Sequence, residues 1–283
     1  MIRRPYYGWI VLAVTVPVLM VSAGMRSAAG AWLLPMREDL GWSTATLSLA
    51  AAVGLVVYGF AAPLAGALIQ RHGVRAVTPL GLLAGSLSMA AVAFVSTPLQ
   101  LTLVLGVASG LATGIVGGVL GAVVASRWFV RHRGLVVGVT GAAVSAGQLV
   151  FYPSLALAAG AFGWREAALG MAAITAVCVL PAWWWLRDGP ERLGLAPLGA
   201  ELETGGSTQP AQEPAGAVMR RAVAHPTFWL LAATFYVCGA TSNGLIGQHF
   251  IPHAVDHGFT EALAAGALAV VGAFNFVGTI LSG

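Results

Sequence analysis

The chain has 283 residues, of which 58% are hydrophobic and only 8% are charged. A soluble domain carries about 25% charged residues, so this chain cannot cover its surface with polar groups. The composition therefore excludes a soluble globular protein and indicates an integral membrane protein. The formal net charge is +4, but the basic residues lie mostly in short loops, which indicates membrane topology rather than nucleic-acid binding.

Apolar segments long enough to cross a bilayer recur eight times along the chain. They are residues 8–35, 44–69, 74–96, 99–126, 134–160, 166–186, 226–251 and 261–283. The first segment is too long for a cleavable signal peptide and lacks a small-residue cleavage site. The sequence thus predicts an all-α membrane protein with eight spanning helices.

The arginines are distributed unevenly over the connections between these segments. If the N-terminus defines one side of the membrane, the opposite side holds only Arg37 and Arg165. The N-terminal side would hold Arg3, Arg4, Arg71, Arg75, Arg127, Arg131, Arg133, Arg187, Arg192, Arg220 and Arg221. Because arginine is enriched in cytoplasmic loops, we predict a multi-pass protein of the cell (inner) membrane with a cytoplasmic N-terminus.

Residues 187–222 differ in composition from the rest of the chain. They are rich in Pro, Gly, Gln and Glu and show no apolar periodicity. We interpret them as a mobile cytoplasmic linker. The linker would separate an N-terminal six-helix bundle, residues 1–186, from the first two helices of a second bundle, residues 223–283.

The segments on the two sides of this linker resemble each other. A shift of 217 residues aligns residues 30–66 with 247–283 without gaps. The aligned pairs at helix ends are Gly30 with Gly247, Pro35 with Pro252, Gly41 with Gly258 and Gly66 with Gly283. Such a parallel repeat is typical of secondary transporters with two six-helix halves. We therefore expect helices 1–8 of twelve, in a fragment or a truncated gene product that does not transport by itself.

Two motifs carry a resemblance to a known family. The segment GALIQRHGVR, residues 66–75, resembles the loop between helices 2 and 3 of the major facilitator superfamily. The family pattern is matched at Gly66, Arg71, Gly73 and Arg75, whereas Gln70 stands where the family has an aspartate. The resemblance implies a cytoplasmic gating loop that lacks one carboxylate of the family's charge relay.

The second motif, WFVRHRGLVVGVTGAAVSAG at residues 128–147, resembles the helix 4–5 signature of the monocarboxylate transporters and the oxalate/formate antiporter group. Its basic positions are matched by Arg131 and Arg133. On helix 8, Asn275 and Thr279 stand where proton-coupled monocarboxylate carriers have an aspartate and an arginine. The resemblance implies a monomeric major facilitator fold of two six-helix bundles in a lipid bilayer. It further implies a secondary transporter, with no cofactor, metal or nucleic acid, that carries a small organic anion and in some members a coupled proton.

Arg26 lies inside the first apolar segment, where a charge costs about 2.5–3.5 kcal/mol. No segment holds an acidic residue away from its ends that could neutralise it. One interpretation is a side chain that extends to the membrane interface. The other is a cationic anchor in a water-filled cavity, where the guanidinium forks two hydrogen bonds to a carboxylate. We favour the anchor, because the residues after Arg26 are small.

Further polar residues in the spans are candidate substrate ligands. Asn243 is the repeat partner of Arg26, and Asn275 is an isolated amide in the last apolar run. Gln148 and Tyr152 lie one turn apart on the fifth span. Each of these side chains would hydrogen-bond either to the substrate or to a neighbouring helix.

Two regular spacings allow more than one interpretation. On the fourth span, glycines recur every fourth residue, at Gly106, Gly110, Gly114 and Gly118. They predict close packing of another helix or backbone exposed to substrate. Near the seventh span, His249, His253 and His257 have the spacing of a metal-ligand stripe, a pH-sensitive gate or a solvated helix end.

Two alternatives to anion transport remain at this point. One is a major facilitator permease for a neutral or drug-like solute, and the other is a transport-inactive membrane sensor. An enzyme is not expected, because the spans contain no paired carboxylates, nucleophile–base set or metal cluster.

Overall fold

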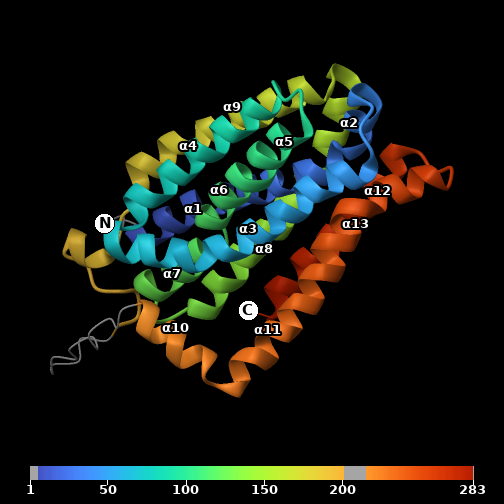
Figure 1. Ribbon diagram of the computed structural model, residues 1–283. Coiled ribbons are helices and arrows are strands. Elements are labelled where there is room, and N and C mark those ends of the chain that lie inside the picture. Colours follow the sequence, from blue (N-terminus) through green and yellow to red (C-terminus); the bar gives the residue numbers. More distant parts are fainter. Residues whose placement is uncertain (1–5, 201–214, 283) are drawn as a thin grey trace.

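A computed structural model describes residues 6–200 and 215–282, and the chain folds into helices joined by short connections (Figure 1). The helices are α1 (Tyr7–Ala31), α2 (Leu33–Leu40), α3 (Thr44–His72), α4 (Val74–Val92), α5 (Pro98–Leu101), η1 (Thr102–Ala108), α6 (Ser109–Val116), α7 (Gly118–Trp128), α8 (Arg133–Phe162), α9 (Trp164–Trp185), η2 (Pro190–Leu193), α10 (Ala215–Val223), α11 (Pro226–Cys238), η3 (Gly239–Ile246), α12 (Gly247–Asp256) and α13 (Glu261–Ser282). The segments η1 and η3 are π-helical, and η2 is a 3-10 turn.

The eight predicted spans are confirmed within the described residues. The helical segments long and apolar enough to cross a membrane are Tyr7–Ala31, Thr44–His72, Val74–Val92, Pro98–Trp128, Arg133–Phe162, Trp164–Trp185, Pro226–Ile246 and Glu261–Thr279. Their boundaries follow the apolar runs, since a bilayer core requires about 20 apolar residues per helix. The fourth span is not one regular helix, because π-helical turns and a break at Gly117 divide it.

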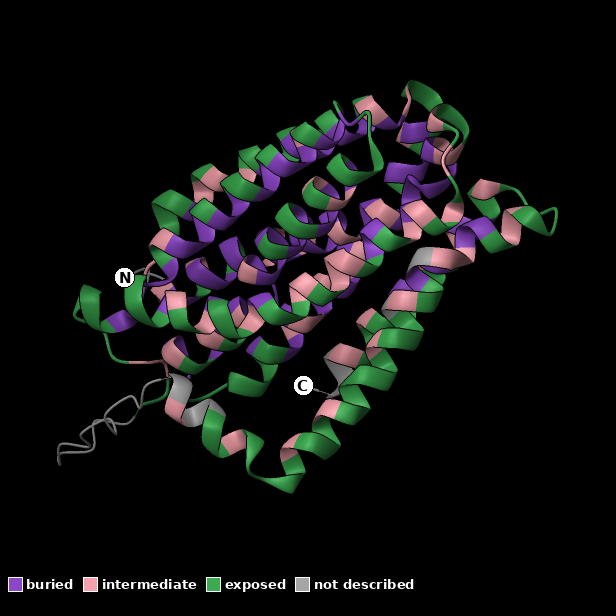
Figure 2. Ribbon diagram, viewed as in Figure 1, coloured by how far each residue is buried: buried purple, intermediate pink, exposed green. Residues whose placement is uncertain are grey.

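The first six spans pack into one bundle, with α1 as its most buried member (Figure 2). Along its length α1 contacts α8, and α4 runs beside α9. Close approach between α1 and α8 depends on Gly147, where an added Cβ would lie 2.5 Å from the carbonyl oxygen of Met20. The bundle therefore brings α1 into contact with helices that come from distant parts of the sequence.

The glycine stripe of the fourth span packs against α3. A Cβ at Gly110 would lie 2.7 Å from the carbonyl oxygen of Gly54, and one at Gly114 would lie 2.4 Å from the Cβ of Ala61. The prediction of close helix packing is confirmed for this part of the stripe. Gly118 has open space around it, because the backbone turns away at Gly117.

The later spans contact the first bundle mainly through α12 and α13. The last helix, α13, runs antiparallel to α8, with Gly272 beside Leu149 and Thr279 beside Gly141. At the other end of this contact, an apolar cluster joins Leu34, Tyr152, Ala156, Ile251, Ala264, Ala265 and Leu268. By contrast, α11 buries none of its residues and stands apart from the bundle (Figure 1).

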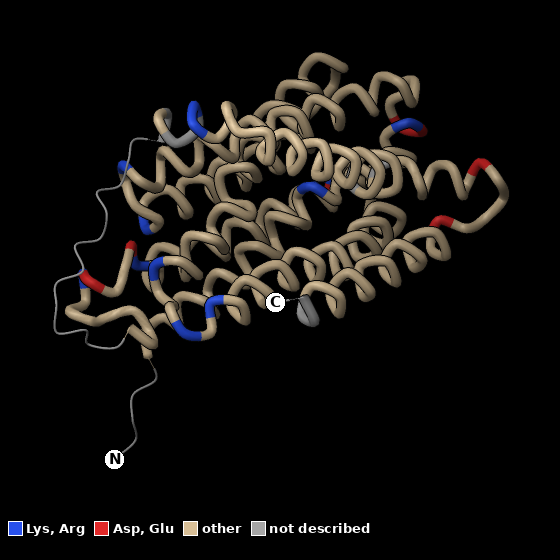
Figure 3. The backbone as a smooth tube through the Cα atoms, turned by 90° about the horizontal axis from the view of Figure 1, so that it is seen from below, with Lys and Arg blue, Asp and Glu red and all other residues tan. Residues whose placement is uncertain are grey.

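Basic residues gather at the end of the bundle where α1 begins (Figure 3). Arg71, Arg75, Arg127, Arg131, Arg133, Arg187 and Arg192 lie there on described loops and helix ends. The first part of the predicted linker, residues 187–200, is packed against this end, with Leu198 hydrogen-bonded to the backbone of Trp128 and Val130. The mobile linker predicted for residues 187–222 is thus wrong for this part, because these backbone groups find partners on the bundle. Arg3, Arg4, Gly283 and residues 201–214 lie outside the described residues.

Two glycines of the predicted repeat occupy the same backbone conformation. Gly41 has φ +67° and Gly258 has φ +88°, in the left-handed region that favours glycine. Each precedes the start of the next span, at Thr44 and Glu261, and both starts keep the shift of 217 residues. The matched glycines therefore form equivalent turns, as the alignment predicts.

Candidate functional site

Arg26 lies in the last third of α1 and its side chain turns toward α3. The guanidinium carbon is 4.8 Å from the centroid of the Tyr58 ring. The Nε atom is buried and has no hydrogen-bond partner. No ion pair connects Arg26 with an acidic side chain among the residues that the structure describes. The side chain is half-buried inside the bundle.

A narrow cleft surrounds this guanidinium, with a free volume of about 30 Å³. It is lined by Met25, Arg26, Ala29, Ala51, Gly54, Leu55, Tyr58, Leu105, Ser109, Gly110 and Thr113. The cleft is narrow because the glycine stripe brings α3 close to the fourth span, and in this conformation it has room for one or two waters. Its polar groups are one cation and three hydroxyls, which suits an anion with hydrogen-bond acceptors.

A second, wider cleft of about 230 Å³ adjoins the first. The two share Ala51 and Leu55 in their walls, so they lie side by side on α3. The second cleft runs between α3, η3 and the start of α12, and its titratable lining residue is His249. Both clefts border a π-helical segment, a local distortion that is frequent at functional sites.

Two of the other predicted ligands, Tyr152 and Gln148, lie on α8. The Tyr152 hydroxyl lies close enough to Ser27 and Arg26 to interact with both, but it donates its hydrogen bond to the backbone carbonyl of Gly247, at 2.8 Å. This bond connects α8 with α12, which is the interhelical alternative for Tyr152. Gln148 is half-buried one turn earlier on α8.

Neither of the two predicted asparagine ligands, Asn243 and Asn275, is seen to line the cleft around Arg26 in the described part of the structure. Asn243 belongs to η3, and its side chain lies outside the described part of the structure. Asn275 is exposed on α13, where its backbone carbonyl accepts a hydrogen bond from Thr279. The structure therefore does not bring Asn275 into the cleft around Arg26.

The predicted gating loop depends on a residue that the sequence motif did not indicate, Asp188. Its carboxylate accepts a hydrogen bond from the backbone N–H of Arg75 at 3.0 Å and pairs with Arg192 at 2.8 Å. Gly73 has φ +83°, and a Cβ there would lie 2.1 Å from this carboxylate. Asp188 thus supplies a carboxylate at the loop whose own sequence has Gln70. The one signal for Asp188 in the sequence is its position as an acidic residue shortly after the tryptophan run that ends the sixth span.

The other members of the gating motif are more loosely held. Gly66 has open space around it, and the side chains of Arg71, Arg131 and Arg133 are exposed at the arginine-rich end. The backbone N–H of Arg131 donates to the carbonyl of Leu198. These arginines are therefore available to charged partners at that end of the bundle.

At the opposite end, ion pairs connect the helices that meet there. Arg37 on α2 pairs with Asp256 on α12 at 3.6 Å, across the boundary between the first bundle and the later spans. Asp39 accepts hydrogen bonds from Arg165 and from the Trp164 indole N–H, and these hold the pKa of Asp39 below its usual value. This end is thus closed by charge pairs as well as by the apolar cluster.

The histidine stripe does not form a metal site. The rings of His253 and His257 lie 4.3 Å apart at an exposed helix end, and no group of three metal-ligating side chains occurs among the described residues. His249 differs from both, because it lines the second cleft.

Comparison with known proteins places these features in a family. The sequence profile of the Major Facilitator Superfamily matches residues 15–283. Human monocarboxylate transporter 11 is 30% identical over 269 residues, which are 93% of this chain and 53% of that protein. The uncharacterised MFS-type transporter YcxA of Bacillus subtilis is 24% identical, over 99% of this chain and 65% of that protein. The chain thus spans between about half and two thirds of the length of these curated relatives.

Solved structures agree in fold. A D-xylose–proton symporter superposes with a TM-score of 0.69 at 13% identity, covering 97% of this chain and 68% of that one. The xylose transporter XylE of E. coli in an inward-open conformation gives 0.60 at 15% identity, covering 97% and 68%. At such identities these likenesses show the fold alone. With the profile match over nearly its whole length, the chain belongs to the Major Facilitator Superfamily.

Proposed function

We propose that the protein carries a small organic anion, a monocarboxylate or related carboxylate, by alternating access, and that Arg26 binds its carboxylate. The observation that carries this proposal is a guanidinium in the cleft between α1, α3 and the fourth span that has no acidic partner among the described residues and whose Nε is buried without a hydrogen bond. A cation in an apolar bundle favours an anionic ligand, and guanidinium matches a carboxylate with two parallel hydrogen bonds.

The surroundings of Arg26 support the same substrate class. The Tyr58 ring steers the guanidinium by a cation–π contact and leaves its edge available for hydrogen bonding. Ser109 and Thr113 add hydroxyls to the cleft. The sequence relationship to a monocarboxylate transporter agrees with an anion, although it covers about half of that relative.

In this proposal the arginine-rich end faces the cytoplasm, in a cell (inner) membrane, and the protein acts as a monomer. The end with the charge pairs then faces outward. Asn243 and Gln148 would assist from neighbouring helices. The division into bundles at residues 1–186 and 223–283 with a linker at 187–222 belongs to the same proposal.

The test is uptake of labelled formate, lactate, pyruvate and oxalate by liposomes that contain the purified full-length protein. Arg26→Gln is expected to weaken binding by about 30-fold or more, because losing a buried charged partner costs about 2–5 kcal/mol. Arg26→Lys should recover part of the activity, since it keeps the charge without the fork. Arg220→Gln, which removes an exposed arginine on α10, is the matched control.

Xylose serves as the neutral comparison solute in the same assay. Normal carboxylate uptake by Arg26→Gln would remove the main support for the proposal. Saturable xylose uptake without carboxylate uptake would replace it with a permease for neutral solutes.

A further inference from the structure

An anion that accumulates in a negatively charged cell does so together with a cation or in exchange for another anion. The described spans offer few residues that could bind a proton for the first route. The chain has ten acidic residues, and all of them lie in loops or at span ends. Histidine is the side chain type whose ordinary titration falls between pH 5 and 8. Of the six histidines, His249 lines the cleft that adjoins the Arg26 site.

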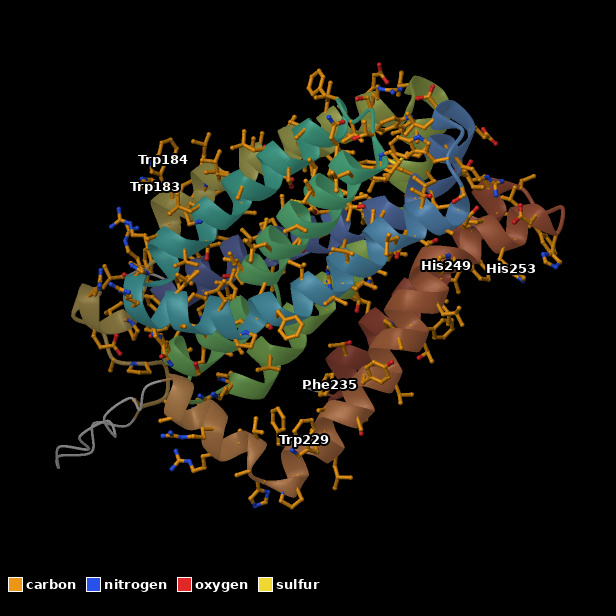
Figure 4. All side chains as sticks on the ribbon, in the orientation of Figure 1. Trp183, Trp184, Trp229, Phe235, His249 and His253 are labelled. Atoms are coloured by element: carbon orange, nitrogen blue, oxygen red, sulfur yellow. The ribbon has the colours of Figure 1, made fainter. Side chains whose placement is uncertain are left out.

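We propose that His249 binds the proton that crosses the membrane with the anion. This inference rests on the proposed function, because it requires an anion at Arg26. His249 is half-buried in the second cleft, whose walls are shared with the Arg26 cleft at Ala51 and Leu55. In Figure 4, His249 lies where α12 approaches α3, whereas His253 lies further along α12, away from α3.

The ring of His249 is available to a proton and to a substrate. It makes no hydrogen bond or ion pair with any residue in the described ranges 6–200 and 215–282. The other residues that line its cleft are Ser48, Ala51, Ala52, Leu55, Ala240, Gly244 and Leu245, and none of these titrates. Among the residues that line this cleft, the Ser48 hydroxyl could accept a hydrogen bond from a protonated imidazole, as could water or a bound anion.

The elements around α12 carry several charged and titratable groups, and Arg26 is the one with a full positive charge in the adjoining cleft. These groups are Tyr7 and Arg26 on α1; Arg37, Glu38 and Asp39 on α2; Tyr58, Arg71 and His72 on α3; Tyr152 and Arg133 on α8; His253 and Asp256 on α12; and Glu261 on α13. Asp256 is paired with Arg37, and Tyr152 donates to a backbone carbonyl. Arg26 and Tyr58 line the adjoining cleft, and the others lie toward the two ends of the bundle.

This arrangement provides a physical basis for coupling. Like charges repel, so a proton in the second cleft would meet the charge of Arg26 in the adjoining cleft. An anion bound to Arg26 neutralises that charge and attracts the proton. By linkage, a proton on His249 strengthens anion binding by the same factor. Proton and anion would thus bind together and leave together, with no net charge moved.

The experiment compares two transport modes in liposomes that contain the full-length protein. Counterflow of labelled lactate requires substrate binding and conformational exchange but no proton gradient. Accumulation driven by an inward pH gradient requires coupling, and one pH unit supports about tenfold accumulation in a one-to-one symport. The variant is His249→Gln, with His249→Asn as a second one, and the matched control is His253→Gln, an exposed histidine one turn away.

The expected result is that both His249 variants still show counterflow, with a weaker affinity for lactate because the proton no longer strengthens anion binding, but lose accumulation. Internal lactate then only reaches the external concentration. His253→Gln should accumulate lactate like the wild type. Normal accumulation by either His249 variant would overturn the proposal, as would wild-type accumulation that ignores the pH gradient. Folded His249 variants that lose counterflow as well would also overturn it, by assigning His249 to substrate binding. Absence of counterflow in the wild type would instead refute the anion site at Arg26.

Discussion

Replacing Asp188 should destabilise the arginine-rich end in a graded way. Asp188→Asn keeps an acceptor for the Arg75 N–H but loses the charge at the start of α4 and the pair with Arg192. The first loss costs about 0.3–1 kcal/mol, and the second at most about 1 kcal/mol, because the Arg192 side chain is 70% exposed. Asp188→Ala also loses the cap, which adds about 0.5–2 kcal/mol. We therefore expect a loss of about 0.3–2 kcal/mol for Asp188→Asn and of about 0.8–4 kcal/mol for Asp188→Ala.

The assay is thermal unfolding of the purified protein, followed by tryptophan fluorescence. A loss of this size lowers the midpoint by several degrees in a chain of this length. Glu191→Ala is the matched control, because Glu191 is an exposed acidic residue in the same segment. If Asp188→Ala and Glu191→Ala unfold at the same temperature, the carboxylate does not hold α4 and the description of the gating loop is wrong.

Three further outcomes are expected. Gly114→Ala should lower the unfolding midpoint, because the new methyl would lie 2.4 Å from the Cβ of an alanine on α3 and overpacking costs about 1–3 kcal/mol. Gly118→Ala, with nothing within 4 Å, should leave the midpoint unchanged or raise it. Arg37→Asp should slow lactate uptake by no more than about fivefold, because an exposed ion pair contributes about 0.2–1 kcal/mol. Adding Asp256→Arg should restore the rate, since it re-forms the pair with the charges exchanged. A rate that the double variant does not recover would contradict the pairing of Arg37 with Asp256. The lowered pKa of Asp39 means that its ion pair stabilises the fold fully above the ordinary value of 3.8 and loses this effect as the pH falls through the depressed value. The difference in unfolding midpoint between the wild type and Asp39→Asn should therefore stay constant from neutral pH to about pH 4 and shrink only below that pH. A difference that already shrinks near pH 6 would contradict the lowered pKa of Asp39.

The span count and the turns could be predicted from the sequence because each depends on local physics. Bilayer thickness sets the length of an apolar run, so the predicted spans agree with the helices within a few residues. A left-handed turn favours glycine, so Gly41 and Gly258 mark equivalent positions in the two aligned segments. Arg26 could be singled out as a candidate site residue for a similar reason, because a single charge in an apolar run is costly wherever the helix packs.

Other features depend on how distant segments meet. The π-helical turns η1 and η3 carry no signal in an apolar pattern of ordinary helical composition. Asp188 accepts a hydrogen bond from Arg75, which lies 113 residues earlier in the sequence. The motif at residues 66–75 therefore shows that Gln70 replaces an aspartate, but it does not show which carboxylate lies at the loop instead. Asn275 is a polar residue in an apolar run, a pattern that indicates a candidate substrate ligand. In the structure it is exposed on α13, and the sequence pattern is the same for either position.

The energetics of Arg26 connect the fold with the proposed transport cycle. Placing the charge inside the bundle costs about 2.5–3.5 kcal/mol, and the cation–π contact with Tyr58 returns about 0.5–2 kcal/mol. The part that remains is not offset by any described acidic side chain, and Nε has no hydrogen-bond partner. A carboxylate in the cleft would offset it, because charge-assisted hydrogen bonds are about twice as strong as neutral ones. In the proposed function, the described part of the bundle would therefore gain stability from an anion at Arg26 while that anion stays bound.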